Sequence, residues 1–128
     1  MKFIKDELLF LAERNKDGYP FSACIYYNKK HYYTVNEVYK LNDPTAHAEI
    51  MAIRKVCQEN NVYELKNAII YSSGEPCPMC LTAIAWTGIK EVYFIDNYSI
   101  ANEKGFKIDQ NCFIANKNLN LNLNIRRF

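Results

Sequence analysis

Residues 68–95, AIIYSSGEPCPMCLTAIAWTGIKEVYFI, decide the fold. Their first four residues form a short apolar run that suits a strand buried on both faces. A helix is expected from Cys77 to about Trp86, and it should end at Gly88, because glycine favours the position just after a helix. A second buried strand is expected at 92–95. Strand, helix and strand in succession indicate a β-α-β crossover, with parallel pairing and helices that cover a sheet.

The chain before this stretch supplies two helices and a hairpin. Residues 2–14 place apolar side chains at helical spacing, with Lys and Glu on the other side. Residues 21–27 and 31–35 are rich in aromatic and β-branched or small apolar residues and flank a polar turn, so they predict a β-hairpin. Asp43-Pro44 has the composition of an N-cap followed by proline at the first helical position. It predicts a second helix from there to about Glu59.

Residues 118–125 alternate asparagine with apolar residues at period two, which predicts an edge strand. Low-complexity disorder is the alternative for this segment. With the elements above, the expected fold class is α/β. We expect a three-layer α/β/α sandwich with a mixed, mostly parallel sheet of about five strands. Residues 1–128 should form a single domain.

Composition and charge exclude several classes of protein. Hydrophobic residues make up 49% of the 128 residues and charged residues 23%, which is the balance of a globular protein with a sizeable interior. A formal charge of +2 is too weak to predict a nucleic-acid surface. No apolar stretch approaches the length of a membrane span and the N-terminus lacks a signal-peptide pattern, so a cytoplasmic location is the default expectation. Five cysteines without a secretion signal favour free thiols or metal ligands over disulfides.

Four residues in two short motifs carry the chemistry. His47 and Glu49 stand near the start of the helix expected after Pro44, and Cys77 and Cys80 stand at the start of the next helix. Side chains lean toward the N-terminus of a helix, so both pairs can address a point near that end. The positive helix ends also lower the pKa of cysteine thiols. One His and two Cys predict a Zn2+ site with a fourth position open to water, while Glu49 is left free to move protons.

Three alternatives compete with an open zinc site. A lone Cys-x-x-Cys could be a redox dithiol, although this leaves His47 and Glu49 unexplained. A structural zinc knuckle could take Cys57 or Cys112 as its fourth ligand. Glu49 could be an ordinary solvated helix residue, and that would be the better interpretation if His47 stood alone.

The two motifs resemble the zinc signature of the cytidine deaminase-like superfamily, H-x-E followed by P-C-x-x-C. The resemblance extends from about residue 20 to residue 109, and its most specific parts are residues 42–50, NDPTAHAEI, and residues 75–80, EPCPMC. Within the superfamily the chain is most similar to bacterial guanine deaminases, because it carries Ala-Ile-Arg-Lys at 52–55 and Glu-Lys-Gly-Phe at 103–106. The tRNA adenosine deaminases share the first motif nearly as well.

The resemblance implies zinc-dependent hydrolytic deamination of a free nucleobase, with guanine converted to xanthine and ammonia as the leading reaction. His47, Cys77 and Cys80 would bind Zn2+, which activates water at neutral pH. Glu49 would take a proton from that water, deliver it to a ring nitrogen and then protonate the leaving ammonia. A small-molecule nucleobase is therefore the expected partner.

The resemblance also places five residues against the substrate, namely Phe21, Asn36, Ala48, Trp86 and Asp109. Asn36 falls where the family places an asparagine that hydrogen-bonds the base, although it could be an ordinary turn residue. Trp86 falls where guanine deaminases keep a pocket aromatic, although it could be a core tryptophan on a buried helix, and Phe21 is similar. Asp109 would be the acidic residue that helps to read and protonate the purine, given a one-residue shift in its loop.

Other functions stay open as candidates. A tRNA adenosine deaminase is favoured by the lysine content and Arg126-Arg127 and opposed by the weak net charge. Cytosine, adenine or a nucleoside could also be the substrate. A catalytically silent, zinc-stabilised binding module would keep the fold, but a structural site has no need for the free carboxylate of Glu49. The resemblance further implies a homodimer, whose C-terminal segments could be exchanged between subunits, and no membrane partner is expected.

Overall fold

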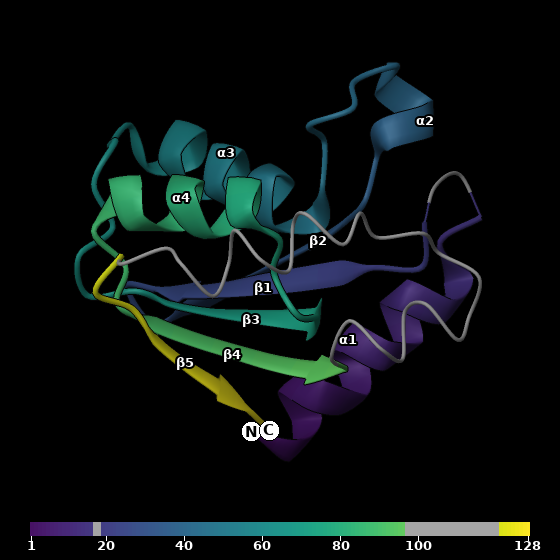
Figure 1. The fold of residues 1–128 in the computed structure, drawn as a ribbon, viewed down its shortest axis with the longest axis horizontal. Coiled ribbons are helices and arrows are strands. Elements are labelled where there is room, and N and C mark those ends of the chain that lie inside the picture. The colour runs from purple at the N-terminus through teal and green to yellow at the C-terminus, as the bar shows by residue number, and fades with distance from the viewer. Residues whose placement is uncertain (17–18, 97–120) are drawn as a thin grey trace.

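A computed structural model describes residues 1–16, 19–96 and 121–128 of the chain (Figure 1). The elements in these residues are α1 (Lys2–Arg14), β1 (Ser22–Tyr27), β2 (Lys30–Val35), α2 (Val38–Leu41), α3 (Ala48–Asn60), β3 (Ile69–Gly74), α4 (Pro78–Thr87), β4 (Glu91–Asp96) and β5 (Asn124–Arg127). The first helix, the hairpin and the strand-helix-strand unit lie close to their expected bounds. The single-turn helix α2 falls where the sequence shows no clear period.

The strands form one sheet in the order β2-β1-β3-β4-β5. β3 pairs parallel with β4, across the expected crossover helix α4, and β4 pairs parallel with β5. β1 is antiparallel to both β2 and β3. The mixed five-stranded sheet is therefore confirmed, and four of its five described strands, all except β1, run in the same direction. A tight turn joins β1 to β2, and α3 carries the chain from β2 back over the sheet to β3. As a result β2 and β3 run the same way, with β1 opposed between them.

Helices cover both faces of the sheet, which confirms the three-layer sandwich (Figure 1). α3 and α4 pack on one face, and α1 packs on the other. The first face buries an apolar cluster that includes Ile25, Val56 and Ile84. The second face buries Leu8 of α1 with Cys24 of β1. Cys24 and Ile25 belong to different clusters because successive residues of a strand point to opposite faces.

The helix expected to begin at Asp43-Pro44 begins later, so this predicted boundary is wrong. Asp43 caps a turn: its Oδ1 accepts the backbone N–H of Thr45 at 2.9 Å and the Thr45 hydroxyl at 2.7 Å. The Ala46 N–H donates to the Asp43 carbonyl at 3.1 Å and closes that turn. α3 begins at Ala48, with His47 as its N-cap. The extra turn therefore places His47 at the boundary of the helix.

The C-terminal edge strand is confirmed, but it lies later than expected. The sequence predicts it at 118–125, of which 118–120 lie outside the described residues. β5 is formed by Asn124–Arg127 and pairs with β4 of the same chain. All four residues of β5 are exposed. Because neither side of this strand is buried, the alternation of polar and apolar residues does not distinguish an inner from an outer face there.

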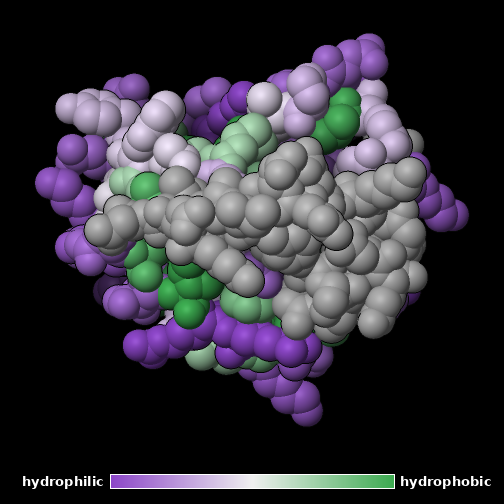
Figure 2. Space-filling view, viewed as in Figure 1, coloured by the Kyte–Doolittle hydropathy of each residue, from purple (hydrophilic) through white to green (hydrophobic). Residues whose placement is uncertain are grey.

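Among the described residues on the side seen in Figure 2, hydrophilic side chains follow much of the rim and hydrophobic ones gather in smaller areas between them. The most exposed large apolar side chains of the described residues are Tyr63, at 84%, and Trp86, at 82%. None of the described helices combines the length and the apolar character that crossing a membrane requires.

Candidate metal centre

Two helix N-termini hold the candidate ligands. His47 is the N-cap of α3 and Cys77 is the N-cap of α4, and both have extended backbone, with φ −64°, ψ 156° and φ −74°, ψ 168°. Pro78 occupies the first turn of α4, where a missing N–H removes no helical hydrogen bond. Cys80 lies in the same turn. The two helices pack against each other, so two partly positive helix ends meet at these side chains.

The geometry of this group fits zinc. The ligand atoms of His47, Cys77 and Cys80 lie within 4.8 Å of one another. His47 Nδ1 is 3.5 Å from Cys80 Sγ and 3.6 Å from Cys77 Sγ. Tetrahedral zinc, with Zn–N of about 2.0–2.1 Å and Zn–S of about 2.3 Å, requires nitrogen–sulfur separations of about 3.6 Å. Cys57 is not in the group and Cys112 lies outside the described residues, so the described part of the chain gathers three ligands here.

The two thiols of the group differ in ionisation. Hydrogen bonds with the Cys80 side chain and with His47 lower the pKa of Cys77 to about 4, against the opposing effect of burial. The pKa of Cys80 is raised well above its usual value, because its thiol bonds to Cys77 and is buried. The bond with Cys77 also raises the pKa of His47. Zinc binds cysteine as thiolate, so metal binding would release the proton that Cys80 retains.

Glu49 lies in the first turn of α3, two residues after His47, and is only 6% exposed. Burial raises the pKa of its carboxyl to about 7, and the charge of Cys77 adds to the shift. This burial excludes the alternative of a solvated helix residue. A carboxyl that titrates near neutral pH can both accept and return a proton. The arrangement can therefore supply an acid/base group next to a metal.

Asn36, expected to contact the substrate, follows β2 and is 2% exposed. Its N–H donates to the Phe21 carbonyl at 3.0 Å, and its carbonyl accepts the Asn15 amide at 2.8 Å. Its side-chain Oδ1 accepts the Val38 N–H at 3.1 Å. The Nδ2 group of Asn36 has no hydrogen-bond partner in residues 1–16, 19–96 or 121–128. A buried amide donor is thus left available at this position.

Two contacts tie Asn36 to distant parts of the chain. The next residue, Glu37, donates its N–H to the carbonyl of Ala46 at 2.9 Å, and Ala46 precedes His47. On the other side, the side chain of Asn15 reaches Asn36 from the end of α1. The sequence does not predict a role for Asn15, because an asparagine after a helix is a common cap and nothing local indicates a remote partner.

The other expected substrate residues lie in different places. Ala48 is fully buried in the first turn of α3, and Phe21 is half-buried just before β1. Trp86 is 82% exposed, and the nine positions that separate it from Cys77 in α4 amount to about 13 Å along the helix. The structure therefore neither brings Trp86 to the ligand group nor buries it as a core residue. Asp109 lies outside the described residues.

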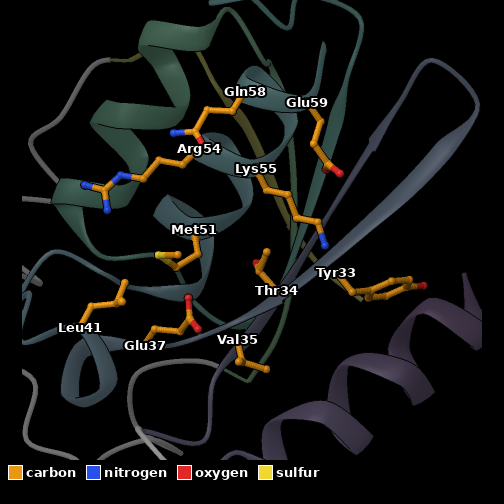
Figure 3. A pocket seen from close by; sticks show the side chains of 10 residues that line it. All are labelled: Tyr33, Thr34, Val35, Glu37, Leu41, Met51, Arg54, Lys55, Gln58 and Glu59. Atoms are coloured by element: carbon orange, nitrogen blue, oxygen red, sulfur yellow. The ribbon is translucent and has the colours of Figure 1, made fainter. Parts of the chain in front are cut away.

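A separate groove of about 620 Å³ runs along β2 (Figure 3). It is lined by side chains of β2, of α2 with its N-cap, and of α3. Glu37 and Glu59 line it together with Arg54 and Lys55, so acidic and basic groups are mixed and no ligand charge is favoured. Arg54 is also paired with Asp43 at 3.3 Å. The candidate metal ligands do not line this groove, which is distinct from the metal centre.

Proteins of similar sequence are deaminases. The chain is 51% identical over 71 residues to the guanine deaminase of Bacillus subtilis (strain 168), a match that spans 56% of this chain and 46% of that protein. It is 42% identical over 59 residues to the tRNA-specific adenosine deaminase of Aquifex aeolicus (strain VF5), which spans 46% of this chain and 39% of that protein. The chain thus matches less than half the length of these two relatives.

The fold is shared with a solved guanine deaminase. The X-ray structure of guanine deaminase from Bacillus subtilis superposes with a TM-score of 0.77 and 39% identity, over 83% of this chain and 70% of that one. A family model of the cytidine and deoxycytidylate deaminase zinc-binding region matches residues 3–96, which contain the three candidate ligands and Glu49. The chain therefore belongs to the cytidine and deoxycytidylate deaminase zinc-binding family, with Zn2+ as its cofactor.

Proposed function

We propose that this chain is a zinc-dependent aminohydrolase that releases ammonia from a free nucleobase, with guanine as its substrate. The observation that carries the proposal is the buried Glu49 carboxyl, with a pKa of about 7, beside one His and two Cys that fit zinc. A purely structural zinc site has no use for such a carboxyl, because burying an ionisable group destabilises the fold. Hydrolytic deamination does need it, because protons must move from water to the ring and to the leaving ammonia.

Each residue of the centre has a role in this reaction. His47, Cys77 and Cys80 would hold zinc, which supplies the Lewis acidity that activates water at neutral pH. Glu49 would accept one proton from water and deliver it to a ring nitrogen of the base. It would then take the second proton of that water, from the hydroxyl now on the ring carbon, and give it to the amino group, which leaves as ammonia. Its position two residues from His47 keeps it within the same helical turn as the ligand.

Asn36 is the residue proposed to orient the base. Its Oδ1 already accepts the Val38 N–H, whereas its Nδ2 group has no partner in the described residues, so we propose that the Nδ2 group contacts the substrate. The substrate must therefore offer an acceptor at that point, as the ring nitrogens of guanine do. Ala48 and Phe21 are proposed to bound the pocket, and Asp109 is proposed as the acidic contact with the purine.

We propose guanine as the substrate, in place of the adenosine of tRNA, for two reasons. The match to guanine deaminase has the higher identity, at 51% over 71 residues against 42% over 59 residues for the tRNA-specific adenosine deaminase of Aquifex aeolicus. A formal charge of +2 is small for a protein that binds a polyanion. The tRNA-specific adenosine deaminases nevertheless supply the second candidate function, because one of them is 42% identical to the chain over 59 residues.

The test is turnover of guanine by the zinc-loaded protein, with ammonia and xanthine measured together. Both products should form in equal amounts. Glu49→Gln should lower the rate by about 10³-fold, within the range that positioned acid/base groups contribute, while retaining its zinc. Failure to turn over guanine would reject that substrate, and inosine formation in tRNA would establish the second candidate. Full zinc content with no ammonia from any base, nucleoside or tRNA would identify a silent binding module.

Subunit pairing belongs to the same proposal. The resemblance to guanine deaminases supports a homodimer. Sedimentation equilibrium of the zinc-loaded protein should give twice the mass of one chain. A single-chain mass at micromolar concentration would reject the dimer without affecting the proposed reaction.

A further inference from the structure

Asn15 links two layers of the sandwich through one side chain. It ends α1, on the sheet face opposite to α3 and α4 (Figure 1). Its Nδ2 donates to the Tyr19 carbonyl at 2.9 Å and to the Asn36 carbonyl at 2.8 Å. Both partners are carbonyl oxygens, so the nitrogen end of the amide must face them. The side chain therefore joins the end of α1 to the residue that follows β2.

The bond from Asn15 acts on a buried group. Asn36 is 2% exposed, and a buried carbonyl that loses its partner is destabilised, so the backbone shifts to regain one. Asn15 is one of three hydrogen-bond partners that fix Asn36, together with Phe21 and Val38. These bonds leave the Nδ2 group of Asn36 as its one polar group without a partner in the described residues. Loss of the bond from Asn15 would allow that group to change direction.

We infer that Asn15 is a positioning residue, which holds Asn36 in the orientation that receives the substrate. The inference rests on the proposed function. Asn15 makes no hydrogen bond with the zinc ligands or with Glu49, which lie on α3 and α4 or at their N-caps. Its loss therefore weakens the binding of the base and leaves zinc binding and proton transfer intact. A rise in KM with little change in kcat is the signature of such a residue.

Asn60 offers a matched control. Its Nδ2 also donates two hydrogen bonds, to the Tyr32 hydroxyl at 3.1 Å and to the Val56 carbonyl at 2.8 Å. It ends α3, thirteen positions after His47, which is about 20 Å along the helix. Asn60→Ala therefore removes the same number of hydrogen bonds from an asparagine Nδ2 group, at a site that has no hydrogen bond to Asn36.

The kinetic test compares Asn15→Ala, Asn15→Asp and Asn60→Ala. Asn15→Asp keeps the size of the side chain but offers only acceptors to two carbonyl oxygens, so it should not rescue the contact. In both Asn15 variants KM for guanine should rise about tenfold, equivalent to about 1.4 kcal/mol of binding, while kcat stays within about twofold. Asn60→Ala should leave both constants unchanged. Equal KM values in Asn15→Ala and Asn60→Ala, or a fall in kcat at unchanged KM, would overturn the inference.

A second measurement needs no substrate and separates this inference from the proposed function. The backbone amides of Asn36 and Val38 should exchange their hydrogens faster in Asn15→Ala, by about tenfold, and at the unaltered rate in Asn60→Ala. Unaltered exchange in Asn15→Ala overturns the inference whatever the activity. If exchange rises as expected but the unaltered protein deaminates no base, the contact between Asn15 and Asn36 is upheld and the proposed reaction is rejected.

Discussion

Cys80 and Cys57 are free cysteines on neighbouring helices, but only Cys80 lies among the candidate ligands. Cys80 Sγ is 3.5 Å from His47 Nδ1, whereas Cys57 is half-buried in α3 and its pKa is raised by burial. Cys80→Ser should weaken zinc binding by more than about 100-fold, because even residues that only orient a ligand contribute up to that factor. Cys57→Ser should keep its zinc. Zinc per chain after dialysis against a weak chelator measures both, and loss from Cys57→Ser would contradict the assignment.

Cys24 makes the stability of the fold sensitive to alkaline pH. Burial raises the pKa of its thiol from 9.0 to about 12, and burial also raises the pKa of Tyr33 to about 12. The folded pKa of Cys24 lies above the unfolded one, so its contribution is fully present below about pH 9 and is lost as the pH rises toward about 12.

Urea unfolding over this pH range should therefore show a falling free energy of unfolding. Cys24→Ala should have a flatter dependence on pH, whatever its absolute stability, and Tyr33 should account for part of the slope that remains. The same slope in Cys24→Ala as in the unaltered protein would show that another group is responsible.

The grouping of His47, Cys77 and Cys80 could be predicted from sequence, because the two motifs together resemble the zinc signature of a known superfamily and each motif lies within one helical turn. The contact of Asn15 could not be predicted, because its partner is a backbone carbonyl 21 positions away and every residue has one. The exposure of Trp86 could not be predicted either. Apolar residues occur on most sides of α4, so its pattern does not indicate which side is buried.

At the scale of elements, the end of α4 depends on Gly88, which has φ +86°. Gly88→Ala should lower the free energy of unfolding by about 1 kcal/mol, because a Cβ disfavours this left-handed conformation. Any Cβ there also meets Lys66 Cγ at 3.0 Å.

Gly88→Asn is the matched comparison for this substitution. It shares the contact with Lys66, but asparagine tolerates the left-handed region, as Asn42 and Asn61 do at the ends of α2 and α3. It should therefore lose less stability than Gly88→Ala in chemical unfolding, and both variants should keep their zinc. Equal losses would assign the effect to the contact and not to the backbone conformation.

Most elements could be predicted because their signals are local. Apolar spacing, turn residues and Gly88 place α1, the hairpin and the β3-α4-β4 unit. The start of α3 could not be predicted, because Asp-Pro is compatible with both a helix cap and a turn. In the structure the N–H and the hydroxyl of Thr45 both bond to Asp43 Oδ1, and this stabilises the turn. The place of β5 depends on pairing with β4, since all its side chains are exposed. The antiparallel pairing of β1 with β3 could not be predicted from local signals, because it depends on the path of the chain through β2 and α3.

At the scale of the molecule, Phe128 packs on the face of the sheet that α1 covers. The Phe128 ring lies 5.6 Å from the ring of Tyr71 and 6.0 Å from that of Tyr93, and the two tyrosines stack at 5.3 Å. The Phe128 N–H donates to the Phe94 carbonyl at 2.8 Å. These contacts join β5 to the two strands that precede it in the sheet.

Phe128→Ala should therefore lower the free energy of unfolding by about 1–2 kcal/mol, less than for a fully buried aromatic. Ile125→Ala, within β5 and at a side chain that is 42% exposed, should change it by less than about 0.5 kcal/mol. Thermal and chemical unfolding measure both. Equal effects of the two substitutions would mean that the aromatic contacts do not stabilise this edge.

The central position of β3 also bears on the order in which the chain folds. Cys77 follows β3, and β3 takes its place only when pairings such as Ala23 with Ser72 form across 49 positions of the chain. Such pairings are slow, because the long intervening loop loses entropy before any contact is gained. We therefore expect the three ligands to assemble late in folding. Uptake of metal during refolding would report the completion of the fold, and the ion would not nucleate it.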